Sequence, residues 1–286
     1  MFKIALKVAY LGRGYHGFAR QPNLPTVEGE LIKALREAKI FDEPAEAGYS
    51  IAGRTDRGVN SLGNVISFRT ESKVNINQLN DILPLNIKVL AQASVHHGFQ
   101  PRFARERHYR YLWPNTPFED DLSLDAIKEG AKEFVGTFDF RNFSKRSERN
   151  PLRTIKSLEV VERENVIMFD VKGESFLWNM VRKIVAVLLN VGKGDLDISD
   201  VKEFLNPQKR VFITPMPSEG LILMDITYDK VKFISDSYAE KIFLSVLMDN
   251  YLDNRTPAAS YEEMMRILDY QKNKGLSVLS GFKVLR

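Results

Sequence analysis

Two stretches of this chain alternate strictly between apolar and polar residues. From Phe2 to Tyr10, the segment FKIALKVAY puts every second side chain on one apolar face. The segment RERHYRYLWPN repeats the pattern with Tyr109, Tyr111 and Trp113. A period of two is the period of a β-strand that buries one face. We therefore expect a sheet with one face against a core in each half of the chain.

Helical periodicity and chain-breaking residues define the segments between these strands. Thr26 can cap a helix that has Glu28 and Glu30 in its favourable first turn. The other expected elements are strands near 47–53, 64–70 and 86–96, a helix near 75–83, a helix from 123 to about 135, strands near 154–162 and 165–172, a helix from about 178 to 191, a short helix near 199–205 and a strand at 221–228. Strand–helix–strand units in both halves predict an α+β protein whose two lobes share or abut their sheets.

The segment 230–286 has a different pattern. Apolar residues recur every four positions from Ile234 to Val246, which is typical of an amphipathic helix. SYEE at 260–263 has the form of a capping box, which begins a helix. We expect a helical C-terminal appendix that contains two helices.

Composition excludes several kinds of site. The chain has no cysteine, so disulfides and thiolate sites are excluded and a reducing, cytoplasmic setting is expected. Its four histidines lack the spacing of metal ligands on a helix, so we expect no metal. No apolar run reaches about 18 residues, so we expect no membrane span. The 41 basic against 37 acidic residues give a net charge of +4, which only hints at a polyanionic partner.

The segment SIAGRTDRGVNSLGNVISF places Asp56 between Arg54 and Arg57, with glycines on both sides. Glycine allows backbone angles and close approaches that other residues cannot adopt. Such a turn could present a carboxylate nucleophile, or it could be a structural turn. The residues alone favour the structural turn and leave the active site open.

Arg182 lies inside the otherwise apolar helix FLWNMVRKIVAVLL. A buried arginine without an anionic partner is costly, so an acidic group should face it. We expect this group to be Asp56. The neighbouring Lys183 could extend its ammonium group to solvent.

Two basic segments suggest contact with RNA. PRFARERHYRY mixes Arg102 and Arg107 with aromatic residues, and arginines with stacking faces suit unstacked nucleotides. The alternative is an amphipathic strand, and we expect Tyr111 and Trp113 to lie in the core. RNFSKRSERNPLR, which contains Arg146 and Arg149, is either a solvated loop or an arm over RNA.

Several segments together resemble one family, the TruA-type tRNA pseudouridine synthases. AGRTDRGVNSLGNVISF resembles its aspartate motif, YLGRGYHGFARQP its first loop, PRFARERHYRYLW its RF-x-RxYRY segment, SFLWNMVRKIVAVLLNVGKG its MVR helix and TPMPSEGLILMDITY its closing strand. The resemblance covers about residues 2 to 228 in family order. It departs at Phe18, Ala19, Asn60, Asn64, Trp178 and Asn179, where the family has other common residues.

The resemblance implies roles for individual residues. Asp56 is expected to be the nucleophile, Arg54 and Arg182 its cationic neighbours, and Tyr109 the aromatic residue that packs against the target base. We expect further contacts to the substrate RNA from Arg20, Arg57, Asn60, Arg102, Arg107, Arg146 and Arg149.

The resemblance also implies the fold and the activity. The expected fold has two ferredoxin-like lobes whose antiparallel sheets meet at a central basic cleft, with domains at 1–104, 105–229 and a helical extension at 230–286. The expected protein is a homodimer that isomerises uridine in the anticodon stem-loop of tRNA, at positions 38–40, without a cofactor. The competing function is a non-catalytic tRNA-binding or RNA-chaperone protein on the same scaffold.

Overall fold

The computed structural model describes residues 1–115, 122–145, 150–164 and 166–273. Contacts within the chain divide it into two compact units, Met1–Ala239 and Glu240–Arg286. The lobe boundary expected after residue 104 stays a prediction.

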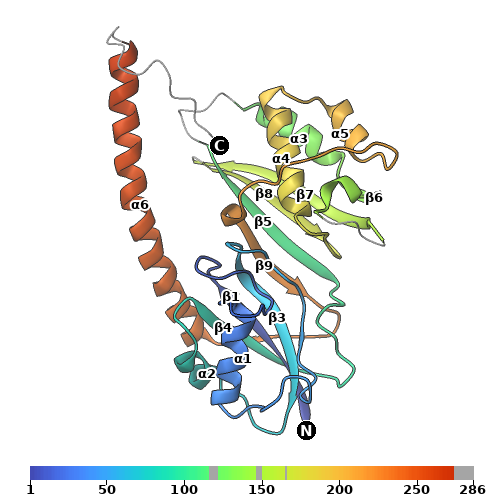
Figure 1. The fold of residues 1–286 in the computed structure, drawn as a ribbon, viewed down its shortest axis with the longest axis vertical. Coiled ribbons are helices and arrows are strands. Elements are labelled where there is room, and N and C mark those ends of the chain that lie inside the picture. The colour runs from blue at the N-terminus through green and yellow to red at the C-terminus, as the bar shows by residue number, and fades with distance from the viewer. Residues whose placement is uncertain (116–121, 146–149, 165, 274–286) are drawn as a thin grey trace. The chain divides into compact units, whose positions relative to one another are not determined.

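The unit Met1–Ala239 is built on a ten-stranded sheet in the order β10-β4-β1-β3-β9-β5-β8-β7-β6, with β2 also paired to β3 (Figure 1). The strands are β1 (Phe2–Tyr10), β2 (Ser50–Ile51), β3 (Asn60–Thr70), β4 (Ile87–Val95), β5 (Glu106–Pro114), β6 (Gly136–Asp139), β7 (Leu152–Arg163), β8 (Val166–Gly173), β9 (Leu221–Thr227) and β10 (Ile234–Ser235). The described strand pairs are antiparallel, except that β3 and β9 run parallel. The predicted α+β class is confirmed, and the two halves share one sheet.

Helices pack on this sheet through two main cores. The helices are α1 (Val27–Glu37), α2 (Ile76–Ile82), α3 (Leu124–Lys132), α4 (Met180–Lys193) and α5 (Ile198–Phe204), with 3-10 turns at Arg141–Phe143 and Ser218–Gly220. Leu31 and Leu35 of α1 join Phe68 in the first core. Ile184 and Leu188 of α4 join a second core in the other half of the sheet.

Side chains at the helix starts explain several boundaries. The Thr26 hydroxyl accepts a hydrogen bond from the Gly29 amide at 3.2 Å, as the sequence predicts. Ser123 caps α3 in the same way through Ala126. α4 begins at Met180, two residues later than expected, because Asn179 has a left-handed backbone with φ of 67°.

The C-terminal part corrects the sequence-based expectation. Ile234 belongs to the short strand β10, so it does not continue the helical stripe. One helix, α6 (Ser237–Asn273), runs through SYEE and includes Pro257, so the expected helix start at Ser260 is wrong. Ala258 and Ala259, which follow the proline, favour helix, whereas Pro257 itself disfavours it. Within the described residues, no helix has both the length and the apolar character that a membrane crossing needs.

Candidate active site

Asp56 lies in a tight turn between β2 and β3 that the first loop of the chain holds in place. The Phe18 amide donates to the Thr55 carbonyl at 3.0 Å, and the Tyr10 and Thr55 hydroxyls lie 2.8 Å apart. Gly17 has φ of 96°, and a Cβ there would lie 2.9 Å from the Thr55 carbonyl oxygen. Only glycine therefore allows this loop to approach the turn so closely.

A second segment packs against the turn from the other side. Gly58 has φ of 84°, and a Cβ there would lie 2.9 Å from the Ser218 hydroxyl and 3.0 Å from the Glu219 carboxylate. The glycine spacing seen in the sequence thus serves a positive φ and a close contact. The Asp56 backbone is enclosed by two segments that are far apart in the sequence.

The Asp56 carboxylate has two donors, one for each oxygen. Trp178 Nε1 donates to Oδ1 at 2.7 Å, and an Arg182 guanidinium nitrogen lies 3.2 Å from Oδ2. The expected ion pair between Asp56 and Arg182 is confirmed. The Arg182 side chain is 14% exposed and the Asp56 side chain 31% exposed, so the carboxylate can be reached from the solvent side.

Arg182 is held by its own half of the molecule, independently of Asp56. Its Nε donates to the Met216 carbonyl at 2.6 Å, and the Met216 amide donates back to the Arg182 carbonyl at 3.2 Å. The same guanidinium nitrogen that faces Asp56, Nη1, also donates to the Asn179 side-chain oxygen at 3.1 Å. The guanidinium group is therefore fixed before a substrate arrives, which favours preorganised electrostatics.

Lys183 does not extend to solvent, contrary to the expectation from sequence. It is 6% exposed, and its ammonium group donates to the carbonyls of Asn142 at 3.1 Å and Ser144 at 2.9 Å. Burial lowers the pKa of Lys183. The carbonyls compensate for burial of the charge, and the lysine ties the segment 142–144 to α4.

Tyr109 lies on the face of β5 that also carries the buried Tyr111. Its ring is half-buried and meets Phe176 edge-on, with ring centroids 5.1 Å apart. Burial raises the pKa of the Tyr109 phenol, Arg107 opposes this shift, and the Asp56 carboxylate adds to it. The phenol and the carboxylate thus lie close enough to interact electrostatically.

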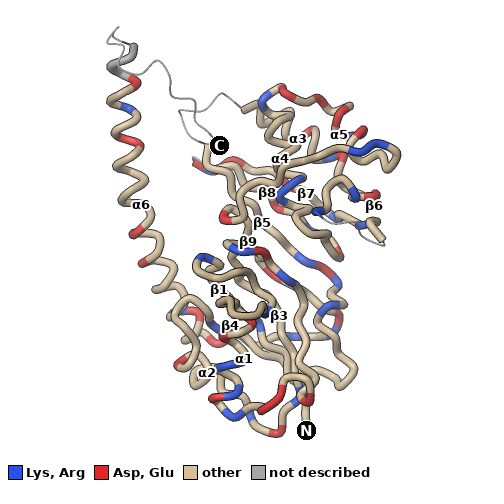
Figure 2. The backbone as a smooth tube through the Cα atoms, in the orientation of Figure 1, with Lys and Arg blue, Asp and Glu red and all other residues tan. Residues whose placement is uncertain are grey.

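The Asp56 carboxylate faces a cavity of about 990 Å³. Basic side chains from both halves of the sheet line this cavity with it, namely Arg20, Arg54, Arg57, Arg141, Lys145 and Arg210. Figure 2 shows the Lys and Arg positions among the described residues, including those on the loop that follows α5. Such a concentration of positive charge attracts a polyanion much more strongly than the net charge of +4 indicates.

Arg20 and Arg57, which were expected to contact RNA, are exposed on the cavity wall. Arg54, which was expected to be a cationic neighbour of Asp56, is exposed on the same wall. Arg20 also pairs with Glu28 at 3.8 Å. Among the described residues, Trp178 and Arg182 bind the Asp56 carboxylate directly. Arg54 and Arg57 add positive charge to the cavity wall near it.

The expectation that Arg107 contacts RNA requires a correction, because this residue is buried and only 8% exposed. Its guanidinium group donates to the backbone carbonyls of Ala52 at 3.1 Å, Arg102 at 2.8 Å and Glu174. These bonds join β5 to the segment that precedes Asp56. We therefore assign Arg107 a structural role in place of an RNA contact.

Other expected contacts also lie elsewhere. The Asn60 side-chain oxygen accepts from the Gly12 amide at 2.9 Å and so fixes the first loop. Arg102 is exposed and stacks on Phe103 at 4.5 Å. Neither Asn60 nor Arg102 is among the described residues that line the cavity. Arg146 and Arg149 lie outside the described residues.

The sequence-based reasoning missed Trp178 as a site residue. Helical spacing gave no signal for it, because Trp178 lies before the first residue of α4, Met180. It also missed Arg210 and Phe212, which line the cavity from a loop without periodicity. Among the described residues, no cluster of three or more His, Cys, Asp or Glu could hold a metal ion.

Comparison with known proteins gives a consistent family. A family model described as tRNA pseudouridine synthase matches residues 131–229. A tRNA pseudouridine synthase A of Methanothermobacter thermautotrophicus is 50% identical over 88% of this chain and 90% of that protein. Those of Methanosphaera stadtmanae and Thermococcus sibiricus are 46% and 37% identical, over 88% and 92% of this chain and 93% and 98% of those proteins. This chain therefore belongs to the TruA family of tRNA pseudouridine synthases and is an isomerase of that class.

Proposed function

We propose that this enzyme isomerises uridine in the anticodon stem-loop of tRNA, at positions 38–40, with Asp56 as the nucleophile. The observation that supports this assignment best is the environment of the Asp56 carboxylate. It is partly exposed, it is held by Trp178 and Arg182, and it faces a large cavity lined with basic residues.

The reaction rearranges atoms within one nucleotide. The N1–C1′ bond of uridine breaks, a C5–C1′ bond forms, and the proton on C5 is replaced by one on N1. A carboxylate suits such a reaction, because it can attack carbon and then leave. Asp56 could attack C6 of the base or C1′ of the ribose, and either route gives this overall exchange of bonds.

The side chains around Asp56 have separable roles in this proposal. Trp178 and Arg182 set the direction of the carboxylate and stabilise it whenever it is released. Tyr109 packs against the target base, which must leave the stack at a cost of a few kcal/mol. Arg20, Arg54 and Arg57 hold the phosphate backbone. A homodimer in which one tRNA contacts both subunits is part of the same proposal.

The direct test is to incubate the purified protein with unmodified tRNA transcripts and to map pseudouridine at single-nucleotide resolution. We expect new pseudouridine only in the anticodon stem-loop. Modification confined to another region would overturn the target assignment. Tight tRNA binding without any new pseudouridine would instead support the non-catalytic alternative.

A further inference from the structure

Phe212 is the most exposed large apolar side chain of the cavity wall. It lies in the loop between α5 and the 3-10 turn Ser218–Gly220, and 90% of it is exposed. It lines the same cavity as Asp56, and Arg210 lies two residues before it on the same wall. An aromatic ring left in water beside an arginine is the combination that binds single-stranded nucleotides by stacking.

The loop that carries Phe212 is fixed by one buried amide. Asn142 is 7% exposed, and its Nδ2 donates to the carbonyls of Phe204 at 2.8 Å and Lys209 at 3.0 Å. The Val211 amide donates to Asn142 Oδ1 at 3.4 Å. These three contacts bracket the loop immediately before Phe212, so the ring projects from a braced segment.

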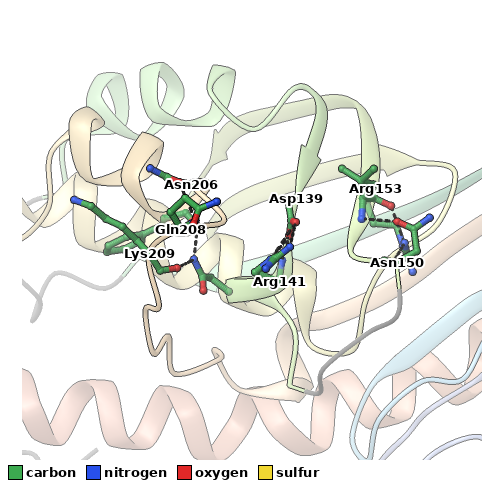
Figure 3. A network of polar contacts seen from close by, with 10 residues as sticks. Asp139, Arg141, Asn150, Arg153, Asn206, Gln208 and Lys209 are labelled. Carbon is green, nitrogen blue, oxygen red and sulfur yellow. Dashed lines mark hydrogen bonds and ion pairs between the residues drawn. The ribbon is translucent and has the colours of Figure 1, made fainter.

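The loop also has an internal turn. The Gln208 amide donates to the Asn206 side-chain oxygen at 2.9 Å, and Figure 3 shows Asn206, Gln208 and Lys209 together in this loop. On the neighbouring segment, Arg141 makes a bidentate pair with Asp139, which Figure 3 also shows. This pair lowers the pKa of Asp139 through the hydrogen bonds from Arg141.

The brace extends to the catalytic side of the cavity. Lys183 donates to the Asn142 carbonyl at 3.1 Å, and Lys183 directly follows Arg182 on α4. The helix that positions the Asp56 carboxylate therefore also supports the wall that carries Phe212. Because α4 supports both the Asp56 carboxylate and the wall that carries Phe212, it fixes their relative position.

The cavity extends from Asp56 to the loop that carries Phe212. Its volume of about 990 Å³ lies at the upper end of the ~300–1,000 Å³ range of pockets that enclose small molecules. The target uridine would occupy the part next to Asp56. The part next to Arg210 and Phe212 remains for a neighbouring nucleotide.

We propose that Phe212 stacks on a second unstacked base of the tRNA, next to the target uridine, while Arg210 contacts the phosphate of that nucleotide. This inference rests on the proposed function, because it takes the occupant to be the strand that contains the target. Stacking on an aromatic ring does not depend on base identity. Phe212 therefore selects for an unpaired nucleotide at that position, which favours a loop or a stem end over a continuous helix.

The test measures the affinity of wild type and Phe212→Ala for a series of anticodon stem-loops, each with one abasic nucleotide. At one position near the target, base removal should weaken wild-type binding by about 5-fold to 100-fold. The same removal should have little effect on Phe212→Ala, because the stacking partner is already absent. If both proteins lose the same affinity at every position, the inference is wrong.

Three further variants separate stacking from folding. Phe212→Tyr keeps an aromatic face and should bind like wild type, whereas Phe212→Leu keeps an apolar side chain and should behave like Phe212→Ala. Phe2→Ala removes another exposed phenylalanine, 42% exposed on β1, and should leave the abasic profile unchanged. Equal affinity of Phe212→Leu and wild type would contradict stacking.

The binding measurements do not depend on turnover, so they separate this inference from the proposed function. If wild type forms no pseudouridine in the stem-loop, the proposed function fails, whatever the abasic profile shows. If wild type forms pseudouridine and Phe212→Ala shows the wild-type abasic profile, only the role of Phe212 is refuted.

Discussion

Two carboxylates of this protein each bind an arginine and a ring N–H, yet they are held in different ways. Asp170 accepts from Arg110 through both of its oxygens, at 2.9–3.2 Å, and lies 2.5 Å from His108 Nε2. Asp56 receives one donor on each oxygen, from Trp178 and Arg182. The Asp170 side chain is 15% exposed, half the value of Asp56.

The origin of the donors differs as well. Arg110 and Asp170 are directly opposite each other on β5 and β8, so strand register alone brings them together. The donors of Asp56 lie 122 and 126 positions away in the sequence and reach it only after both halves have folded. The first arrangement uses a carboxylate to stabilise a sheet. The second presents a carboxylate to a cavity, where it is available for chemistry.

The largest effect on the rate of pseudouridine formation should come from replacing Arg182. Arg182→Met keeps helix propensity and apolar volume but removes the fixed charge beside Asp56. We expect pseudouridine formation to fall on the order of 10²-fold or more, with a folded far-UV circular dichroism spectrum.

Arg110→Met is the matched variant on the other face of the sheet. It should lower the free energy of unfolding by about 1–2 kcal/mol, less than for a fully buried pair because Arg110 is 30% exposed. Its rate of pseudouridine formation should match wild type. A large rate loss in Arg110→Met with none in Arg182→Met would reverse the comparison.

The next effect concerns the hydrogen bond from Trp178 to Asp56. Trp178→Phe keeps an aromatic ring and removes the indole N–H together with part of the ring area. Because a hydrogen bond to a charged group contributes about 1.5–3 kcal/mol, we expect single-turnover pseudouridine formation to slow by about 10-fold, with unchanged affinity for tRNA. Trp113→Phe changes the other tryptophan, which lies in the core, and should leave the rate unchanged. Equal rates for Trp178→Phe and wild type would show that Arg182 alone positions the carboxylate.

A pH-dependent effect should be specific to Asp170. Burial would raise the pKa of this carboxyl, but hydrogen bonds from Arg110 and His108 outweigh it and lower the pKa. A carboxyl with a lowered pKa in the folded state stabilises the protein at pH values above its unfolded-state pKa of about 3.9. This stabilisation is lost as the pH falls through the folded-state pKa. Wild type should thus exceed Asp170→Asn in unfolding free energy at pH 7 by roughly 1 kcal/mol. In urea titrations this difference should shrink below about pH 4, and a constant difference would exclude the linkage.

The smallest effect should come from a single phosphate contact. Arg210→Gln should reduce the slope of log affinity for tRNA against log salt by about one unit. Arg163→Gln, at the exposed end of β7 and outside the cavity lining, should leave the slope unchanged. Identical slopes for both variants would remove Arg210 from the RNA-binding surface.

Much of the sheet and the ion pair between Asp56 and Arg182 could be predicted from the sequence. β1 and β5 follow from period-two alternation, and α1 follows from Thr26 and its acidic first turn. The contact between Asp56 and Arg182 follows from a simple requirement, because a lone arginine in an apolar helix needs an anion.

The burial of Arg107 could also have been predicted from the sequence. This residue has the same parity along β5 as Tyr109 and Tyr111, so alternation already placed it on the buried face. The charge of Arg107 suggested contact with RNA, but its position on the strand determines that it is buried.

The wall around Phe212 could not be predicted. The loop after α5 has no periodicity, and its shape depends on Asn142, which lies more than 60 positions earlier in the sequence. Likewise β6 and β10 are too short to show a reliable period, with four and two residues. Features that arise from distant side-chain contacts leave no local pattern.

Asp56 is proposed to react with the substrate and Asp170 to stabilise the sheet, and single-turnover pseudouridine formation distinguishes these two roles. Wild type, Asp56→Asn and Asp170→Asn would be compared in metal-free preparations at saturating enzyme with a tRNA that wild type modifies. We predict comparable rates for wild type and Asp170→Asn, and no product for Asp56→Asn although it binds the tRNA within a few-fold of wild type. Measurable pseudouridine formation by Asp56→Asn would exclude Asp56 as the nucleophile.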